Sequence, residues 1–176
     1  MDVCDECQYT YASEDESSIP DRLRTLGRRY GAPLSRFLPG EDGDALLRAH
    51  PVPDGWSALE YACHVRDVLE VQRERITQTL TEDTPTYVPM GREERVKERA
   101  YNEQNPAGVA AAIVGQAEEL AVAFEALSAE DWARTGMYSY PEPAKRSLVW
   151  LGQDTIHEAH HHLLDLGRTM RAARGR

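Results

Sequence analysis

The sequence is dominated by segments in which apolar residues recur at three- and four-residue steps, the spacing of one face of an α-helix. Four such segments lie at about residues 18–38, 57–80, 105–127 and 146–173. No stretch shows the alternation of a half-buried strand, and no internal repeat is visible. Amphipathic helices bury their apolar stripes most simply against one another, so we predict an all-α four-helix bundle.

Local signals set the helix boundaries. Ser57 and Glu60 have the spacing of a capping box, and Asn105 followed by Pro106 is another favoured start. Gly31 and Pro33 are expected to kink or interrupt the first helix. Long connections join helices two and three and helices three and four, and the first of them holds a charged run expected to form a short exposed helix, at residues 92–103.

Length and charge limit the class of protein. A chain of 176 residues suits one domain, which we place at residues 18–176 behind an extended N-terminal arm at residues 1–17. The net charge of −10 leaves no basic surplus for nucleic acid or an anionic membrane. The start lacks a signal peptide and no later run approaches a membrane span, so a cytoplasmic protein is expected.

Histidines concentrate in the last predicted helix. His157 and His161 are four residues apart, which places both side chains on one face, able to bind one ion. His64, on a helix that can face the last one, is the obvious third ligand. Three imidazoles leave a coordination position open, as in catalytic rather than structural zinc sites.

Several alternatives accompany this metal site. Asp154 and Glu60 are spaced to accept hydrogen bonds from the ligand rings, and either could also move protons in catalysis. His160 could replace His161 as a ligand, since it lies three residues after His157. In the simplest alternative, the histidines are merely polar residues on a half-exposed helix.

The N-terminal arm carries a Cys-x-x-Cys pair, Cys4 and Cys7. Two thiolates at this spacing form half of a structural zinc site, or a redox pair, and no second Cys-x-x-Cys completes the former. The arm could fold over the bundle and give one thiolate to the metal. Reduced, idle thiols on an acidic tail are the simpler interpretation.

The pattern as a whole resembles the DinB/YfiT-like superfamily of metal-dependent bundle proteins. The resemblance is carried by residues 55–64, by the long connections on both sides of the third helix, and by residues 157–162. Carried over residue by residue, the family's ligands fall on His64, His157 and His161, the trio already chosen by spacing. The resemblance also implies an up-down-down-up bundle and often a homodimer.

Function follows from the resemblance more loosely. It implies a metal-dependent enzyme that transfers a low-molecular-weight thiol, of the mycothiol or bacillithiol type, to a small electrophile. The divalent metal is expected to be zinc, with nickel as the alternative, and the substrate a small molecule. A metal-dependent hydrolase is the second interpretation. The third is a non-catalytic metal-binding or redox-responsive protein.

Overall fold

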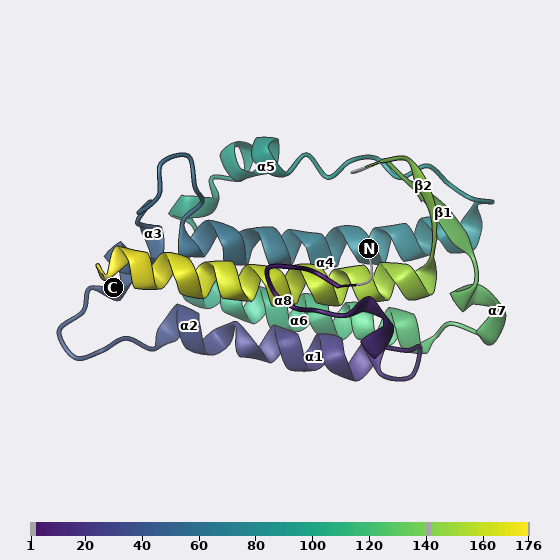
Figure 1. Ribbon diagram of the computed structural model, residues 1–176, viewed down its shortest axis with the longest axis horizontal. Coiled ribbons are helices and arrows are strands. Elements are labelled where there is room, and N and C mark those ends of the chain that lie inside the picture. Colours follow the sequence, from purple (N-terminus) through teal and green to yellow (C-terminus); the bar gives the residue numbers. More distant parts are fainter. Residues whose placement is uncertain (1–2, 140–141, 176) are drawn as a thin grey trace.

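The computed structural model describes residues 3–139 and 142–175. Four long helices form the bundle: α1 (Ile19–Arg29), α4 (Ala58–Thr81), α6 (Pro106–Glu125) and α8 (Leu148–Ala173). Each packs on two others, in the cyclic order α1, α6, α4 and α8. Figure 1 shows that α1 and α8 run in one direction and α4 and α6 in the other. The predicted up-down-down-up bundle is therefore confirmed.

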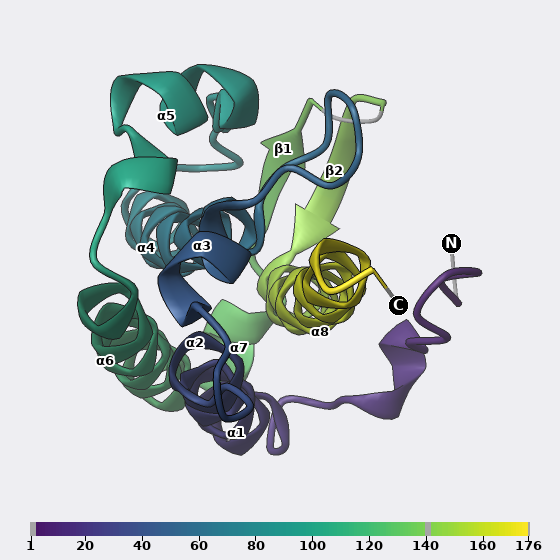
Figure 2. The same cartoon turned by 90° about the vertical axis from the view of Figure 1, so that its left-hand side faces the viewer.

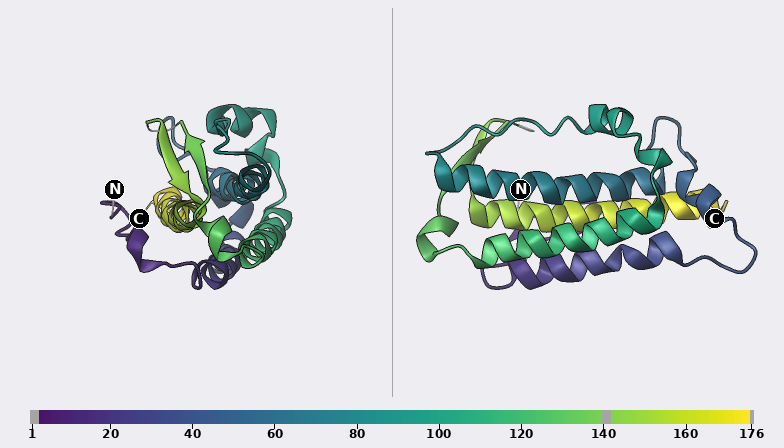
Figure 3. Two further views of the ribbon diagram at one scale, coloured as in Figure 1. Left: turned by 90° about the vertical axis from the view of Figure 1, so that its right-hand side faces the viewer. Right: turned by 180° about the vertical axis from the view of Figure 1, so that it is seen from behind.

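The remaining elements are short. The arm contains one short helix, η1 (Tyr11–Ser13). The connections between the long helices contain the others: α2 (Gly31–Ser35), α3 (Gly43–Arg48), α5 (Arg92–Glu98), η2 (Tyr101–Glu103), α7 (Ala129–Trp132), β1 (Thr135–Tyr138) and β2 (Ala144–Ser147). Because α4 and α6 are parallel, the chain between them must return along the whole bundle (Figure 3). This return passes through α5 and η2.

The predicted helix starts agree with the structure. The hydroxyl of Ser57 accepts the Glu60 N–H and the Glu60 carboxylate accepts the Ser57 N–H, a complete capping box at the start of α4. Asn105 caps α6 in the same sense, with Pro106 as the first helical residue. The first predicted helix is interrupted as expected, because α1 ends at Arg29 and α2 begins at Gly31.

The absence of strands was a wrong prediction. β1 and β2 pair antiparallel, with Thr135 opposite Ser147 and Tyr138 opposite Ala144. The backbone of Tyr87 also donates a hydrogen bond to Met137, which ties the two long connections together. Four-residue strands are too short for sequence periodicity to reveal them, and both lie in the single connection between α6 and α8.

The segment after α5 is buried against α4, although the charged run at residues 92–103 was expected to be an exposed helix. Tyr101 is fully buried, and its hydroxyl donates a 2.6 Å hydrogen bond to the carboxylate of Asp67, also fully buried. That carboxylate is paired with Arg66 at 2.7 Å and Arg99 at 3.0 Å. A buried carboxylate needs such partners, so this cluster fixes the return segment on α4.

The N-terminal arm was predicted to be extended, and this was wrong. Val3 and Thr10 form an antiparallel bridge, and the turn between them brings Cys4 and Cys7 against the protein. Viewed along the bundle, the arm lies beside α8 and then passes under it to reach α1 (Figure 2). Tyr9 within the turn is 6% exposed, so the arm extends the hydrophobic core.

Helix α6 also departs from an expectation. Its 20 residues reach a mean hydropathy of 1.4, so by length and composition alone it could cross a membrane. In this fold α6 packs against α1 and α4, and a core helix of a bundle can be as long and as apolar as a membrane-spanning helix. The statement that no run approaches a membrane span was therefore too strong.

Candidate metal centre

The metal-binding groups of α8 come from residues 157–162, where two pairs with a four-residue spacing interleave. Successive helical residues are turned by about 100°, so neighbouring pairs face different directions. His157 and His161 face the N-terminal arm, whereas Glu158 and His162 face α4. The two pairs therefore belong to two different groups of side chains that could hold a metal ion.

The first group consists of His64 on α4 with Glu158 and His162 on α8. One carboxylate oxygen of Glu158 lies 3.4 Å from Nε2 of His162 and 3.8 Å from Nε2 of His64. The longer distance exceeds that of a hydrogen bond. Atoms that bind one tetrahedral zinc at about 2.0 to 2.2 Å lie roughly 3.3 to 3.6 Å apart, so the three donors fit a shared ion with little movement.

A fourth residue orients one of these donors. Nδ1 of His162 lies 3.1 Å from the carboxylate of Asp165, one turn further along α8. This contact orients the ring with Nδ1 toward Asp165 and Nε2 toward Glu158, so Nε2 can bind a metal once the cation displaces its proton. A carboxylate behind the far nitrogen is the usual support of a metal-binding histidine.

The charges of this group depend on one another. Burial by itself would raise the pKa of Glu158 and lower the pKa of His162. The negative carboxylate and the positive imidazolium lie side by side, and their attraction outweighs this effect of burial. Next to His162 and His64, the pKa of Glu158 falls well below its ordinary value. Contacts with Asp165 and Glu158 raise the pKa of His162 to about 9. Burial lowers the pKa of His64, which favours the neutral ring that a metal requires.

Aromatic side chains surround the first group. The ring of Trp56 lies 5.0 Å from that of His64, and the ring of Tyr61 lies 5.5 Å from that of His162. Arg92 on α5 lies over the Trp56 ring at 6.0 Å. Two surface hollows, of about 410 and 300 Å³, lie elsewhere, the first beside Glu41 and Arg174 and the second beside Glu82 and Arg134.

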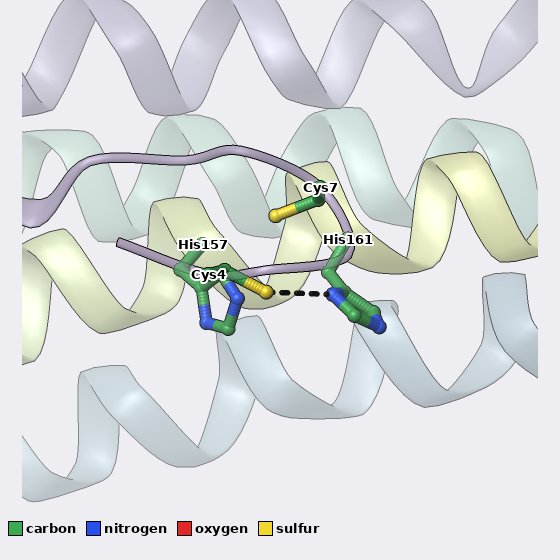
Figure 4. A group of neighbouring side chains, drawn as sticks. All are labelled: Cys4, Cys7, His157 and His161. Carbon is green, nitrogen blue, oxygen red and sulfur yellow. Dashed lines mark hydrogen bonds between the residues drawn. The ribbon is translucent and has the colours of Figure 1, made fainter. Parts of the chain in front are cut away.

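The second group joins the arm to α8. Cys4, Cys7, His157 and His161 each offer a donor atom, and these atoms all lie within 4.8 Å of one another. Figure 4 shows the two thiols coming from the turn of the arm and the two rings from α8. Sγ of Cys4 lies 3.6 Å from Nδ1 of His161. Burial raises the pKa of the Cys7 thiol, and the neighbouring Cys4 adds to this effect.

Comparison with known proteins supports a family for this fold. A family model described as the DinB superfamily matches residues 38–166. The chain belongs to the DinB superfamily. Among solved structures, YfiT from Bacillus subtilis matches with a TM-score of 0.74 and 18% identity, over 88% of this chain and 87% of that chain. A search among curated protein sequences found no match.

YfiT is described as "a probable metal-dependent hydrolase with an unusual four-helix bundle topology". At this level of identity, the likeness shows that the present DinB protein shares the fold of YfiT. The fold class predicted from the sequence is therefore confirmed, and so is the recognised family.

The predicted trio of ligands is divided in this DinB protein. His157 and His161 lie together, as their spacing requires, but they face Cys4 and Cys7. His64 lies instead with the other pair on α8. The three-histidine set stays a prediction, and the structure groups its members differently.

The predicted supporting residues are also divided. The carboxylate of Asp154 accepts a 2.9 Å hydrogen bond from the Tyr11 hydroxyl, which lies 3.0 Å from Nδ1 of His157. Asp154 thus reaches His157 through Tyr11. The carboxylate of Glu60 faces the start of α4, where it accepts the Ser57 N–H, and does not support His64 in the way expected.

His160 belongs to neither group of donors. Its ring lies 6.4 Å from the ring of Tyr9, and its Nδ1 is buried without a hydrogen-bond partner among the described residues. Burial lowers its pKa, as expected for a neutral ring packed against the arm. The structure therefore favours His161 over His160 as a metal ligand.

Sequence reasoning missed Glu158 and His162 as a pair. A signal for them was present: they continue the helical row of Leu151 and Thr155, which are buried in the bundle. A polar pair in phase with buried apolar residues points into the interior, where it needs a partner. That partner is His64.

Proposed function

We propose that this DinB protein is a metal-dependent enzyme whose divalent cation is held by His64, Glu158 and His162. The observation that carries the proposal is the convergence of three donors from two facing helices, backed by the Asp165 carboxylate. Nε2 of His64 lies 3.8 Å from Glu158, beyond hydrogen-bond distance, and its Nδ1 is buried without a hydrogen-bond partner among the described residues, so hydrogen bonds do not explain the burial of this ring. Bundle interiors are a frequent place for such metals.

The donor set suits a catalytic ion. Two histidines and one carboxylate leave at least one coordination position open for a reactant. When bound there, a divalent cation lowers the pKa of a coordinated thiol or water, so that a nucleophile is present at neutral pH. Imidazole and carboxylate donors suit zinc, with nickel as the alternative.

The surrounding residues select and orient the reactants. Trp56 and Tyr61 provide aromatic walls beside the donor atoms, and they exclude water from one side of the site. Arg92 lies over Trp56 with its side chain 59% exposed, where it can pair with an anionic group of an incoming substrate. A small molecule with a negatively charged part fits this arrangement.

The reaction that we assign first is transfer of a low-molecular-weight thiol to a small electrophile. The thiol loses its proton to solvent, and its sulfur forms a bond to an electrophilic carbon of an activated double bond or an epoxide. The π bond or the carbon–oxygen bond at that carbon breaks, and the electron pair released takes up a proton from solvent. The superfamily resemblance supports this assignment. Hydrolysis is the second candidate, favoured by the donor set, because two histidines and a glutamate also hold zinc in thermolysin and carboxypeptidase A.

The experiment loads the purified protein with zinc and measures turnover of a panel of small electrophiles with and without an added thiol. Turnover that requires both zinc and thiol supports the transferase, whereas turnover with zinc alone supports the hydrolase. Glu158→Gln should abolish either activity. Glu98→Gln, a change on exposed α5, is the matched control that should retain it.

Metal content must be measured on the same variants. Removing His64 or His162 should reduce bound zinc by one ion per chain, as counted by elemental mass spectrometry. The proposal would be rejected if these variants kept all the zinc of the wild type. It would equally be rejected if the loss occurred but activity were unaffected.

A further inference from the structure

The turn of the N-terminal arm places two thiols opposite the outer histidine pair of α8. We propose that Cys4, Cys7, His157 and His161 form a second metal site, a closed zinc site that fastens the arm to the bundle. It is separate from the site of the proposed function, because it shares no ligand with His64, Glu158 and His162. Four protein ligands leave no position for a reactant, which is typical of structural zinc.

Each imidazole presents a free nitrogen to the thiols. The Tyr11 hydroxyl lies 3.0 Å from Nδ1 of His157 and donates its own proton to Asp154, so the ring proton is held on Nδ1. Nε2 of His157 is therefore left as a lone-pair donor, and it is buried without a hydrogen-bond partner among the described residues. A buried nitrogen in this state needs an explanation, and a bound cation provides one.

His161 is oriented in the opposite sense. Its Nε2 lies 3.4 Å from the carboxylate of Asp165 and 3.8 Å from that of Glu6. These two negative charges favour the ring proton on Nε2. Its Nδ1 then faces Sγ of Cys4 at 3.6 Å. A sulfur at about 2.3 Å and a nitrogen at about 2.0 to 2.1 Å from one tetrahedral zinc lie roughly 3.5 to 3.6 Å apart, in agreement with this distance.

The backbone of the arm is shaped to present both thiols. The N–H of Cys4 donates to the carbonyl of Tyr9 at 2.9 Å, and the N–H of Gln8 donates to the carbonyl of Cys4 at 2.8 Å. Gln8 adopts a left-handed conformation, with φ of 58°, which turns the chain sharply after Cys7. Such a conformation is uncommon outside glycine and persists because the surrounding contacts fix it.

The chemistry of the four donors selects the ion. Thiolate and imidazole donors in a tetrahedral set favour zinc over magnesium, calcium or manganese, which prefer oxygen. Two thiolates also balance the charge of a divalent cation in this half-buried place, whereas two free thiolates side by side would repel each other. A bound cation would thus give the free thiols of Cys4 and Cys7 a structural function.

The arm makes further contacts along the same face of α8. Tyr9 stacks on His157 with ring centroids 5.6 Å apart, and Tyr11 stacks on Trp150 at 6.0 Å. Arg168 pairs with Glu6 at 3.4 Å. The exposed ion pair stabilises a terminal segment only slightly, whereas the buried Tyr9 ring adds apolar packing, and a zinc ion would add its ligand bonds to these contacts.

The test uses cobalt and zinc on the full chain under reducing conditions. Wild type and a His64→Ala/His162→Ala double variant should show the thiolate-to-cobalt charge-transfer absorption, and a Cys4→Ser/Cys7→Ser double variant should lack it. The cysteine variant should also bind one zinc ion fewer than the wild type. Cys63→Ala, which removes the third thiol in the core, should keep both the absorption and the zinc.

A second measurement needs no substitution and so does not depend on the folding of a variant. In the zinc-loaded wild type, Cys4 and Cys7 should react slowly with a thiol reagent, and a chelator should raise the rate at least tenfold. Unprotected thiols in the zinc-loaded protein, a disulfide between Cys4 and Cys7 under reducing conditions, or unchanged zinc in the cysteine variant would overturn the proposal. Loss of the His64 site alone leaves these results unchanged, which keeps the two proposals distinguishable.

Discussion

At the scale of single residues, Asp165 connects the two proposed metal sites. One of its carboxylate oxygens lies 3.1 Å from Nδ1 of His162 and 3.4 Å from Nε2 of His161. These are the ring nitrogens that face away from the two groups of donors. Its pKa is therefore lowered: burial opposes ionisation, but His162 and His161 favour it more strongly.

The shared carboxylate leads to the first prediction. We expect Asp165→Ala to weaken zinc binding at both sites by about 10- to 100-fold, because each ligand ring loses the group that fixes its tautomer. Competition with a chromophoric chelator measures both affinities in one titration. Asp83→Ala, an exposed change near the end of α4, is the control that should leave them unchanged. An effect confined to one site would show that Asp165 supports only that site.

A second residue-scale prediction concerns Tyr11. We expect Tyr11→Phe to weaken zinc binding at the arm site, because the phenol no longer holds the proton of His157 on Nδ1. The site of His64, Glu158 and His162 should be affected much less, since the hydrogen bonds of the Tyr11 hydroxyl go to Asp154 and His157. The same chelator titration checks this. Equal weakening of both sites would contradict the assigned role.

At the scale of elements, the close approach of α1 to α6 depends on a glycine. A Cβ at Gly27 would lie 2.7 Å from Cβ of Ala117, whereas a Cβ at Gly31 would meet nothing within 4 Å. We expect Gly27→Ala to lower the free energy of unfolding by roughly 1–2 kcal/mol, because overpacking outweighs the gain in helix propensity. Gly31→Ala should be neutral or stabilise by about 0.4–1 kcal/mol. Urea denaturation measures both, and equal effects would refute the packing argument.

The same pair of helices is joined by an ion cluster. Arg24 on α1 lies 2.9 Å from Glu118 and 2.6 Å from Glu125 on α6. Contacts with Arg24 lower the pKa of both carboxyl groups from 4.5. A lowered pKa means that their contribution to stability is present above about pH 4.5 and is lost as the pH falls through the folded-state values.

We therefore expect Arg24→Gln to lower the unfolding temperature at pH 7, by an amount that shrinks as the pH falls below about 4.5 and that salt also reduces. Thermal unfolding followed by circular dichroism over that pH range is the measurement. Arg28→Gln, one turn later on α1, is the matched control. A difference that is independent of pH would mean that Arg24 acts through packing of its stem rather than through charge.

At the scale of the whole molecule, the bundle and the arm are separable parts. The core lies among α1, α4, α6 and α8, and the arm lies along the outer side of α8 with an ion pair from Glu14 to Arg22 of α1 (Figure 2). We expect a chain that begins at residue 14 to keep the helical circular dichroism of the wild type but to bind one zinc ion fewer. Loss of helical structure on this truncation would contradict the predicted boundary at residues 17 and 18. The expected homodimer stays a prediction, which light scattering would check.

The sequence by itself determined the bundle and where its helices begin. The three-to-four spacing of apolar residues, the capping box of Ser57 and Glu60, and the cap at Asn105 are local features, so they can be found without knowing the fold. The sequence also determined that His157 and His161 lie on one face of the last helix, because a four-residue spacing fixes their common direction.

Only the tertiary structure decided which partners each pair meets. The rotation of α8 within the bundle turns Glu158 and His162 toward His64, and it turns His157 and His161 outward. The turn of the arm then brings Cys4 and Cys7 to the outward pair across more than 150 residues of sequence. The row of buried residues on α8 indicates which pair points inward, but the partners of each pair depend on how the helices and the arm pack, which a local pattern does not specify.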